Sequence, residues 1–199
     1  IDVLLADNTA DEKHQTEAML APPGNPVVQK GDLFLLGSHR VICGDCRNSE
    51  TMSRLMEGAR ASVVVTDPPF NVRVNGHVLT GKCKHAEFAM ASGEMSADEF
   101  TAFLVDSFTQ FREYSVDGSL HYIFMDWRHV REILQAGDQV YYDLLNICAW
   151  AKTNAGMGSL YRSQHEFIFV FKNGKASHLN NVQLGKFGRN RSNVWSYAG

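Results

Sequence analysis

Short apolar runs alternate with helix-like segments through the middle of the chain. Runs at 32–36 and 40–43 flank a Gly-Ser turn, a pattern typical of a β-hairpin or of two successive strands. Further strands are expected at 61–66, 119–125, 141–150 and 165–171, with helices at 49–58 and 126–137 and after Ser96. This alternation predicts an α/β fold with a mixed sheet and helices on its faces, in which the last two strands form an antiparallel edge.

The helix after Ser96 has the clearest boundaries and the clearest face. Ser96 and Glu99 form a capping-box pattern. The apolar side chains that follow share one helical face and are expected to pack in the core: Phe100, Phe103, Leu104, Phe108 and Phe111.

The composition indicates one globular domain with an N-terminal arm. The chain has 199 residues, of which 44% are hydrophobic and 21% are charged, so it can bury a core. Residues 1–30 are acidic and rich in turn formers, which predicts an arm or linker before a domain at 31–199. The chain contains no apolar run of membrane length and no signal peptide, so a soluble cytoplasmic protein is expected. Because it begins at Ile1, we expect a fragment or a processed product.

Positive charge is concentrated in the segment 151–199. Against one acid, Glu166, this segment carries Lys152, Arg162, Lys172, Lys175, Lys186, Arg189 and Arg191. Such a segment can neutralise phosphates, and the alternative is a solvated loop that happens to be basic.

The strand at 61–66 ends at a corner with candidate chemistry. Asp67-Pro68-Pro69-Phe70 follows it directly, and the prolines must end the strand because they have no N–H for the sheet. A carboxylate and a carbonyl oxygen on this rigid corner can accept two hydrogen bonds from an amino group. Phe70 can stack on the ring that bears the amine, as a base flipped out of a duplex requires. On its own, the same pattern also fits an ordinary turn after a core strand.

Several ordered motifs resemble those of the DNA amino-methyltransferases, which methylate exocyclic nitrogens of adenine or cytosine. Thr66-Asp67-Pro68-Pro69-Phe70-Asn71 is similar to their catalytic motif, and Gly44-Asp45 to their G-D element. The motifs that follow suit the permuted order of the beta class: Trp150-Ala151-Lys152, Arg162-Ser163-Gln164-His165-Glu166, and residues 188–195. The resemblance covers residues 30–199 and implies a Rossmann-like methyltransferase fold.

The resemblance implies roles for individual residues. Asp67 and the Pro68 carbonyl would hold the target amine, Phe70 would stack on the flipped base, and Pro69 and Asn71 would shape the corner. Asp45 and Asp67 would lie near S-adenosyl-L-methionine, with Asp45 by its adenine. The D-P-P-F form favours adenine N6 as the target, with cytosine N4 as the alternative. By charge alone, we expect double-stranded DNA to be contacted by Lys152, Arg162, Arg189 and Arg191.

One family feature is missing from the sequence. The glycine-rich F-x-G-x-G turn that holds the methionine end of the cofactor does not occur, and Gly156-x-Gly158 lacks the third glycine of such a turn. We therefore expect a catalytic domain that is incomplete at its C-terminus, weak cofactor binding, and no activity from this segment alone. The resemblance also allows an upstream ParB-like domain, a partner nuclease or a homodimer.

Three other interpretations of the sequence are weighed against this resemblance. Cys43 and Cys46, with Cys83 and His85, could bind zinc, although small buried thiols at a strand end are the simpler interpretation, and no metal is expected. A non-enzymatic nucleic-acid-binding module would also account for the basic, aromatic C-terminal segment. His165-Glu166 could be an acid–base pair, but adjacent strand residues point to opposite faces, which favours a role in orienting the loop.

Overall fold

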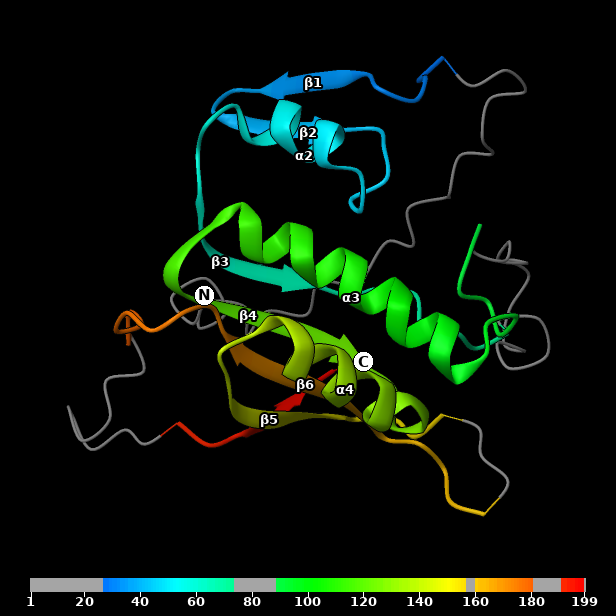
Figure 1. The fold of residues 1–199 in the computed structure, drawn as a ribbon. Helices are drawn as coiled ribbons and strands as arrows, with labels where there is room; N and C mark the ends of the chain where they lie inside the picture. Colours follow the sequence, from blue (N-terminus) through cyan, green and yellow to red (C-terminus); the bar gives the residue numbers. More distant parts are fainter. Residues whose placement is uncertain (1–26, 74–88, 157–159, 181–190, 199) are drawn as a thin grey trace, which may run out of the picture.

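The computed structural model describes residues 27–73, 89–156, 160–180 and 191–198. Its elements are β1 (Leu33–Leu36), β2 (His39–Ile42), α2 (Ser49–Met56), β3 (Ala61–Thr66), α3 (Ala97–Glu113), β4 (Ser115–Met125), the 3₁₀ turn η1 (Trp127–His129), α4 (Val130–Val140), β5 (Asp143–Lys152), β6 (His165–Lys172) and β7 (Val194–Tyr197) (Figure 1). Among these residues, no helix combines the length and the apolar character needed to cross a bilayer.

A five-stranded mixed sheet forms the body of the fold. Its order is β3-β4-β6-β5-β7, with β3 parallel to β4, β6 antiparallel to both β4 and β5, and β7 parallel to β5. The expected mixed α/β sheet is therefore confirmed. The antiparallel pair β5–β6 lies inside the sheet and not at its edge, because β7 adds to β5. The expected hairpin is also confirmed, since β1 and β2 form a separate antiparallel pair.

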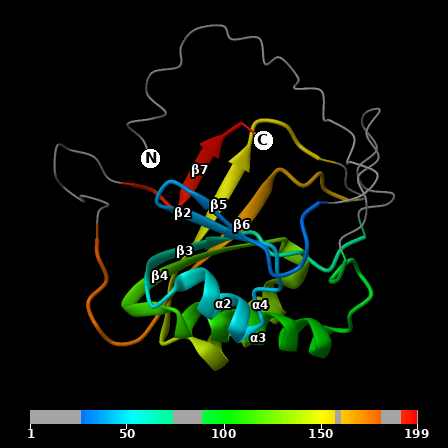
Figure 2. The same cartoon turned by 90° about the horizontal axis from the view of Figure 1, so that it is seen from above.

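The two faces of the sheet differ in what covers them. Helices α3 and α4 pack on one face, around a core that includes Phe100, Phe108, Ile133 and Phe171 (Figures 1 and 2). The other face carries a second apolar cluster centred on Ile168, which consists entirely of strand residues. Helices were expected on both faces; in the part of the chain that the structure describes, α3 and α4 share one face, and α2 packs beside β2 of the separate hairpin.

Local signals placed α3 correctly but misplaced two other helix ends. The capping box of Ser96 and Glu99 is present as predicted. The cap of α2 is Asn48, one residue before the predicted Ser49, because the Asn48 side chain accepts the Thr51 N–H. Gly137 was predicted to end its helix but lies inside α4. A Cβ there would come within 2.3 Å of the Phe171 ring, so glycine allows close packing on the sheet.

A buried polar chain crosses the core between β4 and the end of α4. His121 is fully buried, with Nε2 3.1 Å from Ser119 Oγ and Nδ1 2.9 Å from the hydroxyl of Tyr141. The Tyr141 ring stacks on Phe171. Burial lowers the pKa of His121 from 6.5 to about 4, because the core disfavours the charged imidazolium. The folded protein therefore keeps this histidine neutral.

We predict that His121 makes the protein sensitive to acid. The unfolded chain binds a proton at this histidine below pH 6.5, whereas the folded chain does so only near pH 4. Its contribution to stability is therefore complete above pH 6.5 and falls by roughly 3 kcal/mol as the pH drops to 4. Urea titrations between pH 4 and 7 should show a shallower loss for His121→Leu than for wild type. The exposed control His39→Gln should retain the wild-type slope, and an unchanged slope in His121→Leu would contradict the prediction.

Candidate active site

The proline corner lies where the parallel strands β3 and β4 end together. Thr66 pairs with Ile123, so Asp67 leaves β3 beside the last residues of β4, at the carboxyl edge of the sheet. Ligands of open α/β sheets bind at this edge. Asp67 is exposed, whereas Pro68, Pro69 and Phe70 are half-buried. Phe70 packs against the main core cluster, so the corner is anchored by its aromatic residue.

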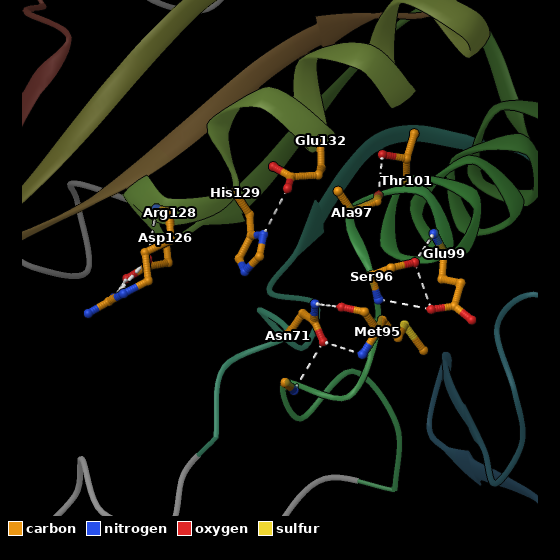
Figure 3. A network of polar contacts seen from close by, with 11 residues as sticks. Asn71, Met95, Ser96, Ala97, Glu99, Thr101, Asp126, Arg128, His129 and Glu132 are labelled. Atoms are coloured by element: carbon orange, nitrogen blue, oxygen red, sulfur yellow. Dashed lines mark hydrogen bonds and ion pairs between the residues drawn. The ribbon is translucent and has the colours of Figure 1, made fainter.

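Asn71 locks the corner onto the segment that leads into α3. It is buried, and its backbone has the left-handed φ of 52°. Its amide nitrogen donates to the Met95 carbonyl (2.8 Å), and its oxygen accepts from the N–H groups of Gly93 (3.0 Å) and Met95 (3.2 Å), as Figure 3 shows. This asparagine therefore joins two segments that the intervening residues 74–88 separate in the sequence.

The segment facing Asn71 is itself held by a carboxylate. Glu94 accepts hydrogen bonds from the backbone N–H groups of Ala91 (2.5 Å) and Ser92 (2.6 Å). Backbone hydrogen bonds of this kind lower the pKa of the Glu94 carboxyl. Gly93, between Ser92 and Glu94, has a φ of 92°, and a Cβ at this position would come within 2.9 Å of Arg73. The backbone opposite the corner is thus fixed by its own side chains.

Two charged residues from other strands act on Asp67. The pKa of its carboxyl is raised, first by desolvation and then by the negative charge of Glu166, while Lys152 acts in the opposite direction. Lys152 and Glu166 form an ion pair, with Nζ 2.5 Å from Oε1, and both side chains are largely buried. The Lys152 ammonium also lies 4.6 Å from the centre of the Trp150 ring. Three strands therefore contribute charge to one edge of the sheet.

Strand register explains why these side chains meet. Glu166 pairs with Trp150 across β5 and β6, and Lys152 lies two residues beyond Trp150 on the same face. His165 points to the opposite face and packs edge-on against Phe167, with ring centres 4.7 Å apart. The expectation that His165 and Glu166 point to opposite faces is confirmed. Sequence reasoning missed that Glu166 approaches Asp67, because the signal lies only in the pairing of β4 with both β3 and β6.

Asp45 occupies a separate part of the structure, in the loop between β2 and α2. Its carboxylate accepts from the Arg47 side chain (2.7 Å) and from the Arg47 backbone N–H (2.9 Å). The hydrogen bond from the Arg47 side chain is the main reason why the pKa of Asp45 is lowered. The Arg47 guanidinium also lies over the Phe103 ring of α3 at 5.0 Å. Asp45 is thus a fixed carboxylate at the surface of α3, and no interaction among the described residues connects it to Asp67.

Comparison with known proteins identifies the family. A family model described as DNA methylase matches residues 61–199, which include Asp67 and every element from β3 onward. The chain belongs to the DNA methylase family. A search of curated proteins found no match.

Solved structures also resemble the methylase chain. One is the M1.HpyAVI–SAM complex, with 14% identity, a TM-score of 0.46, and coverage of 72% of this chain and 58% of that one. Another is TTHA0409 from Thermus thermophilus, described as a candidate DNA modification methylase and complexed with S-adenosyl-L-methionine. It has 17% identity, a TM-score of 0.46, and coverage of 77% and 64%. The methylase chain spans less than two thirds of the length of either structure.

The residues expected to contact DNA differ in their surroundings where the structure describes them. Lys152 is paired with Glu166, and the Arg162 guanidinium donates to the carbonyls of Ala155 (2.6 Å) and Gly156 (3.0 Å). Arg191 is exposed just before β7, and Arg189 lies outside the described residues. Both Lys152 and Arg162 therefore have structural partners within the chain, and their contact with DNA stays a prediction.

Metal ligands do not gather in the part of the chain that the structure describes. Within residues 27–73, 89–156, 160–180 and 191–198, no three side chains of His, Cys, Asp or Glu are grouped as a metal site would require. Cys43 and Cys46 are free thiols. The zinc alternative also needs Cys83 and His85, which lie outside these residues.

We predict that Asn71→Ala loosens the corner. The change removes three hydrogen bonds to the 93–95 segment. It also leaves alanine, whose side chain forms no hydrogen bonds, at a backbone position with a positive φ. The free energy of unfolding should fall by roughly 2–4 kcal/mol in urea titrations. The matched control is Asn48→Ala, which removes only the exposed cap of α2 and should cost about 1 kcal/mol. Equal losses in the two variants would argue against a special role for Asn71.

Proposed function

We propose that the intact protein methylates an exocyclic amino group of a flipped base in duplex DNA. Adenine N6 is the first candidate, because the corner has the D-P-P-F form, and cytosine N4 is the second. The observation that carries the proposal is the position of Asp67, on a proline-stiffened corner at the carboxyl edge of the sheet, in a chain of the DNA methylase family.

Asp67 and Pro68 hold the amino group in this proposal. Two oxygen acceptors, the Asp67 carboxylate and the Pro68 carbonyl, take one hydrogen bond each from the –NH₂ and orient its nitrogen. The base must leave the duplex to reach them, and an aromatic surface offsets the lost stacking. Phe70 supplies that surface from the corner itself, although its half-buried ring offers the base only its exposed part.

The Lys152–Glu166 pair adjusts the charge of this acceptor. Asp67 is the stronger acceptor for an amine, and can take up a proton, when it is ionised, and desolvation together with Glu166 disfavours that form. Lys152 opposes both effects, and its ion pair with Glu166 holds the ammonium at the same edge. A carboxyl poised in this way can hold the amine and then accept the proton that the methylated nitrogen releases.

Two carboxylates of the chain fit parts of S-adenosyl-L-methionine, whereas one expected binding element is missing from the sequence. This cofactor supplies an electrophilic methyl group on a sulfonium sulfur. Asp45 is a candidate to hold its adenosine end, because the Asp45 carboxylate is fixed by Arg47 and its side chain stays 30% exposed. Asp67 is the candidate acid beside the reacting group. The sequence contains no glycine-rich turn for the methionine end, so weak cofactor binding by residues 1–199 alone stays a prediction.

Double-stranded DNA is the partner that the proposal requires. The exposed Arg191 and the expected contact Arg189 fall on the basic segment 151–199, which suits a phosphate backbone. A cytoplasmic location, a homodimer, an upstream ParB-like domain and a partner nuclease belong to the same proposal.

The proposal predicts that Asp67→Ala in the full-length protein slows methylation strongly and leaves DNA binding largely intact. Removing one oriented hydrogen-bonding group at a reacting centre should lower the rate by roughly 10²–10³-fold. Transfer of labelled methyl groups to unmethylated plasmid DNA measures activity, and mass spectrometry of the nucleosides distinguishes N6-methyladenine from N4-methylcytosine.

A matched control for that experiment lies on α4. Asp138→Ala removes an exposed acid away from the corner and should keep full activity. If Asp67→Ala methylates DNA as wild type does, the amine-holding role is wrong. If the wild-type protein binds DNA without methylating it, the non-catalytic alternative is favoured.

The charges around Asp67 also predict the pH dependence of methylation. Activity requires ionised Asp67, so it should fall as the pH drops through the raised pKa of this carboxyl. Glu166→Gln removes a charge that raises this pKa and should shift the acidic limb to lower pH. Lys152→Met removes a charge that lowers it and should shift the limb to higher pH. Glu113→Gln, at the exposed end of α3, should not shift it, and shifts of the same sign in the Glu166 and Lys152 variants would refute this arrangement.

A further inference from the structure

An exposed tryptophan lies at the same edge of the sheet as the proline corner and has no role in the site described above. Trp127 follows the end of β4 in the turn η1, and 51% of its surface is exposed. Because β3 and β4 are parallel with Thr66 opposite Ile123, Asp67 and Trp127 leave the sheet at the same edge.

The turn holds Trp127 firmly without burying it. The Asp126 carboxylate accepts from the Arg128 backbone N–H (2.9 Å), and both of its oxygens accept from Arg128 Nη1 (2.9 Å each). His129 anchors the other end of the turn, packing edge-on against Phe100 at 4.9 Å and lying 3.4 Å from Glu132. These contacts restrict the turn before any ligand arrives, which lowers the entropy lost on binding.

Arg128 and Trp127 together form a compact aromatic and cationic surface. The guanidinium carbon of Arg128 lies 4.8 Å from the centre of the Trp127 ring. Both hydrogen bonds from this guanidinium to Asp126 use Nη1. Its Nε and Nη2 atoms donate no hydrogen bond to any of the described residues. The indole face can stack on a nucleobase, and the neighbouring N–H donors can bind the phosphate of the same strand.

Phe70 leaves room for a second stacking residue at this edge. Its ring is half-buried against the core, whereas about half of the surface of Trp127 is exposed. When a base leaves a duplex, its neighbours lose a stacking partner and become accessible to aromatic side chains. Stacking on an indole is tolerant of sequence, because every base has a π face.

We propose that Trp127 stacks on a DNA base next to the flipped target nucleotide, while Arg128 donates to the adjoining phosphate. This inference rests on the proposed function for its ligand, duplex DNA with one base out of the stack. It assigns DNA contacts to the turn after β4, separate from the basic C-terminal segment.

The test measures binding of the full-length protein to fluorescein-labelled, mixed-sequence DNA. One probe is a fully paired duplex, and the other is the same duplex with one unpaired adenine, which costs little to flip. Wild type should bind the second probe more tightly. Trp127→Ala should lose roughly tenfold in affinity for that probe, as expected for one stacked base, and Trp127→Phe should recover much of it. Arg128→Gln should reduce the slope of log affinity against log salt by about one.

Tyr142 provides a matched control at the opposite edge of the sheet. Its ring is 56% exposed just before β5, with the ammonium groups of Lys172 and Lys175 at 5.4 and 5.8 Å. Tyr142→Ala removes an exposed aromatic ring that, like that of Trp127, lies beside cationic groups, and it should leave binding to both probes unchanged. The proposal is overturned if Trp127→Ala binds both probes as wild type does, or if Tyr142→Ala loses as much affinity.

Two further readouts separate this inference from folding and from the proposed function. If Trp127→Ala does not fold in thermal melts, Trp127→Leu and Trp127→Phe decide, since both keep apolar volume and only phenylalanine keeps a π face. In methylation assays, Trp127→Ala should raise KM for DNA more than it lowers kcat. Unchanged methylation by Asp67→Ala would refute the amine-holding role but leave the binding result for Trp127 standing.

Discussion

The pairing of β4 with its two neighbours is the constraint on which the site depends. β4 runs parallel to β3 on one side and antiparallel to β6 on the other. The first pairing brings Asp67 and Trp127 to the same edge, and the second brings the start of β6, with Glu166, to that edge as well. A slip of one residue would turn every side chain of a strand to the other face and separate these groups.

The same register separates what stabilises the fold from what serves the site. On the helical face, β4 and β6 contribute Ile123, Phe169 and Phe171 to the core under α3 and α4. His121 lies among them with its hydrogen-bonding partners, which keeps a polar group in the core without leaving it unpaired. On the opposite face, the strands end in charged and aromatic groups near Asp67. The alternation of strand residues thus lets one strand stabilise the fold and support the chemistry.

Much of this arrangement was predictable because its signals are local. The capping box of α3, the hairpin of β1 and β2, and the end of β3 at the prolines each depend on residues close together in the sequence. The predictions failed where a distant neighbour decides. Gly137 continues α4 because the Phe171 ring packs against it, and β7 forms because β5 offers an open edge. No pattern within a single element indicates either contact.

For the candidate site, the sequence alone determined the corner at Asp67-Pro68-Pro69-Phe70, since proline geometry and strand termination act within a few residues. The order of the motifs also pointed to the family. Only the tertiary structure decided that Lys152 pairs with Glu166, that Arg162 closes its own loop, and that Trp127 stays exposed beside the corner. Those outcomes depend on strand register and on hydrogen bonds between segments far apart in the chain, where local preferences have no influence.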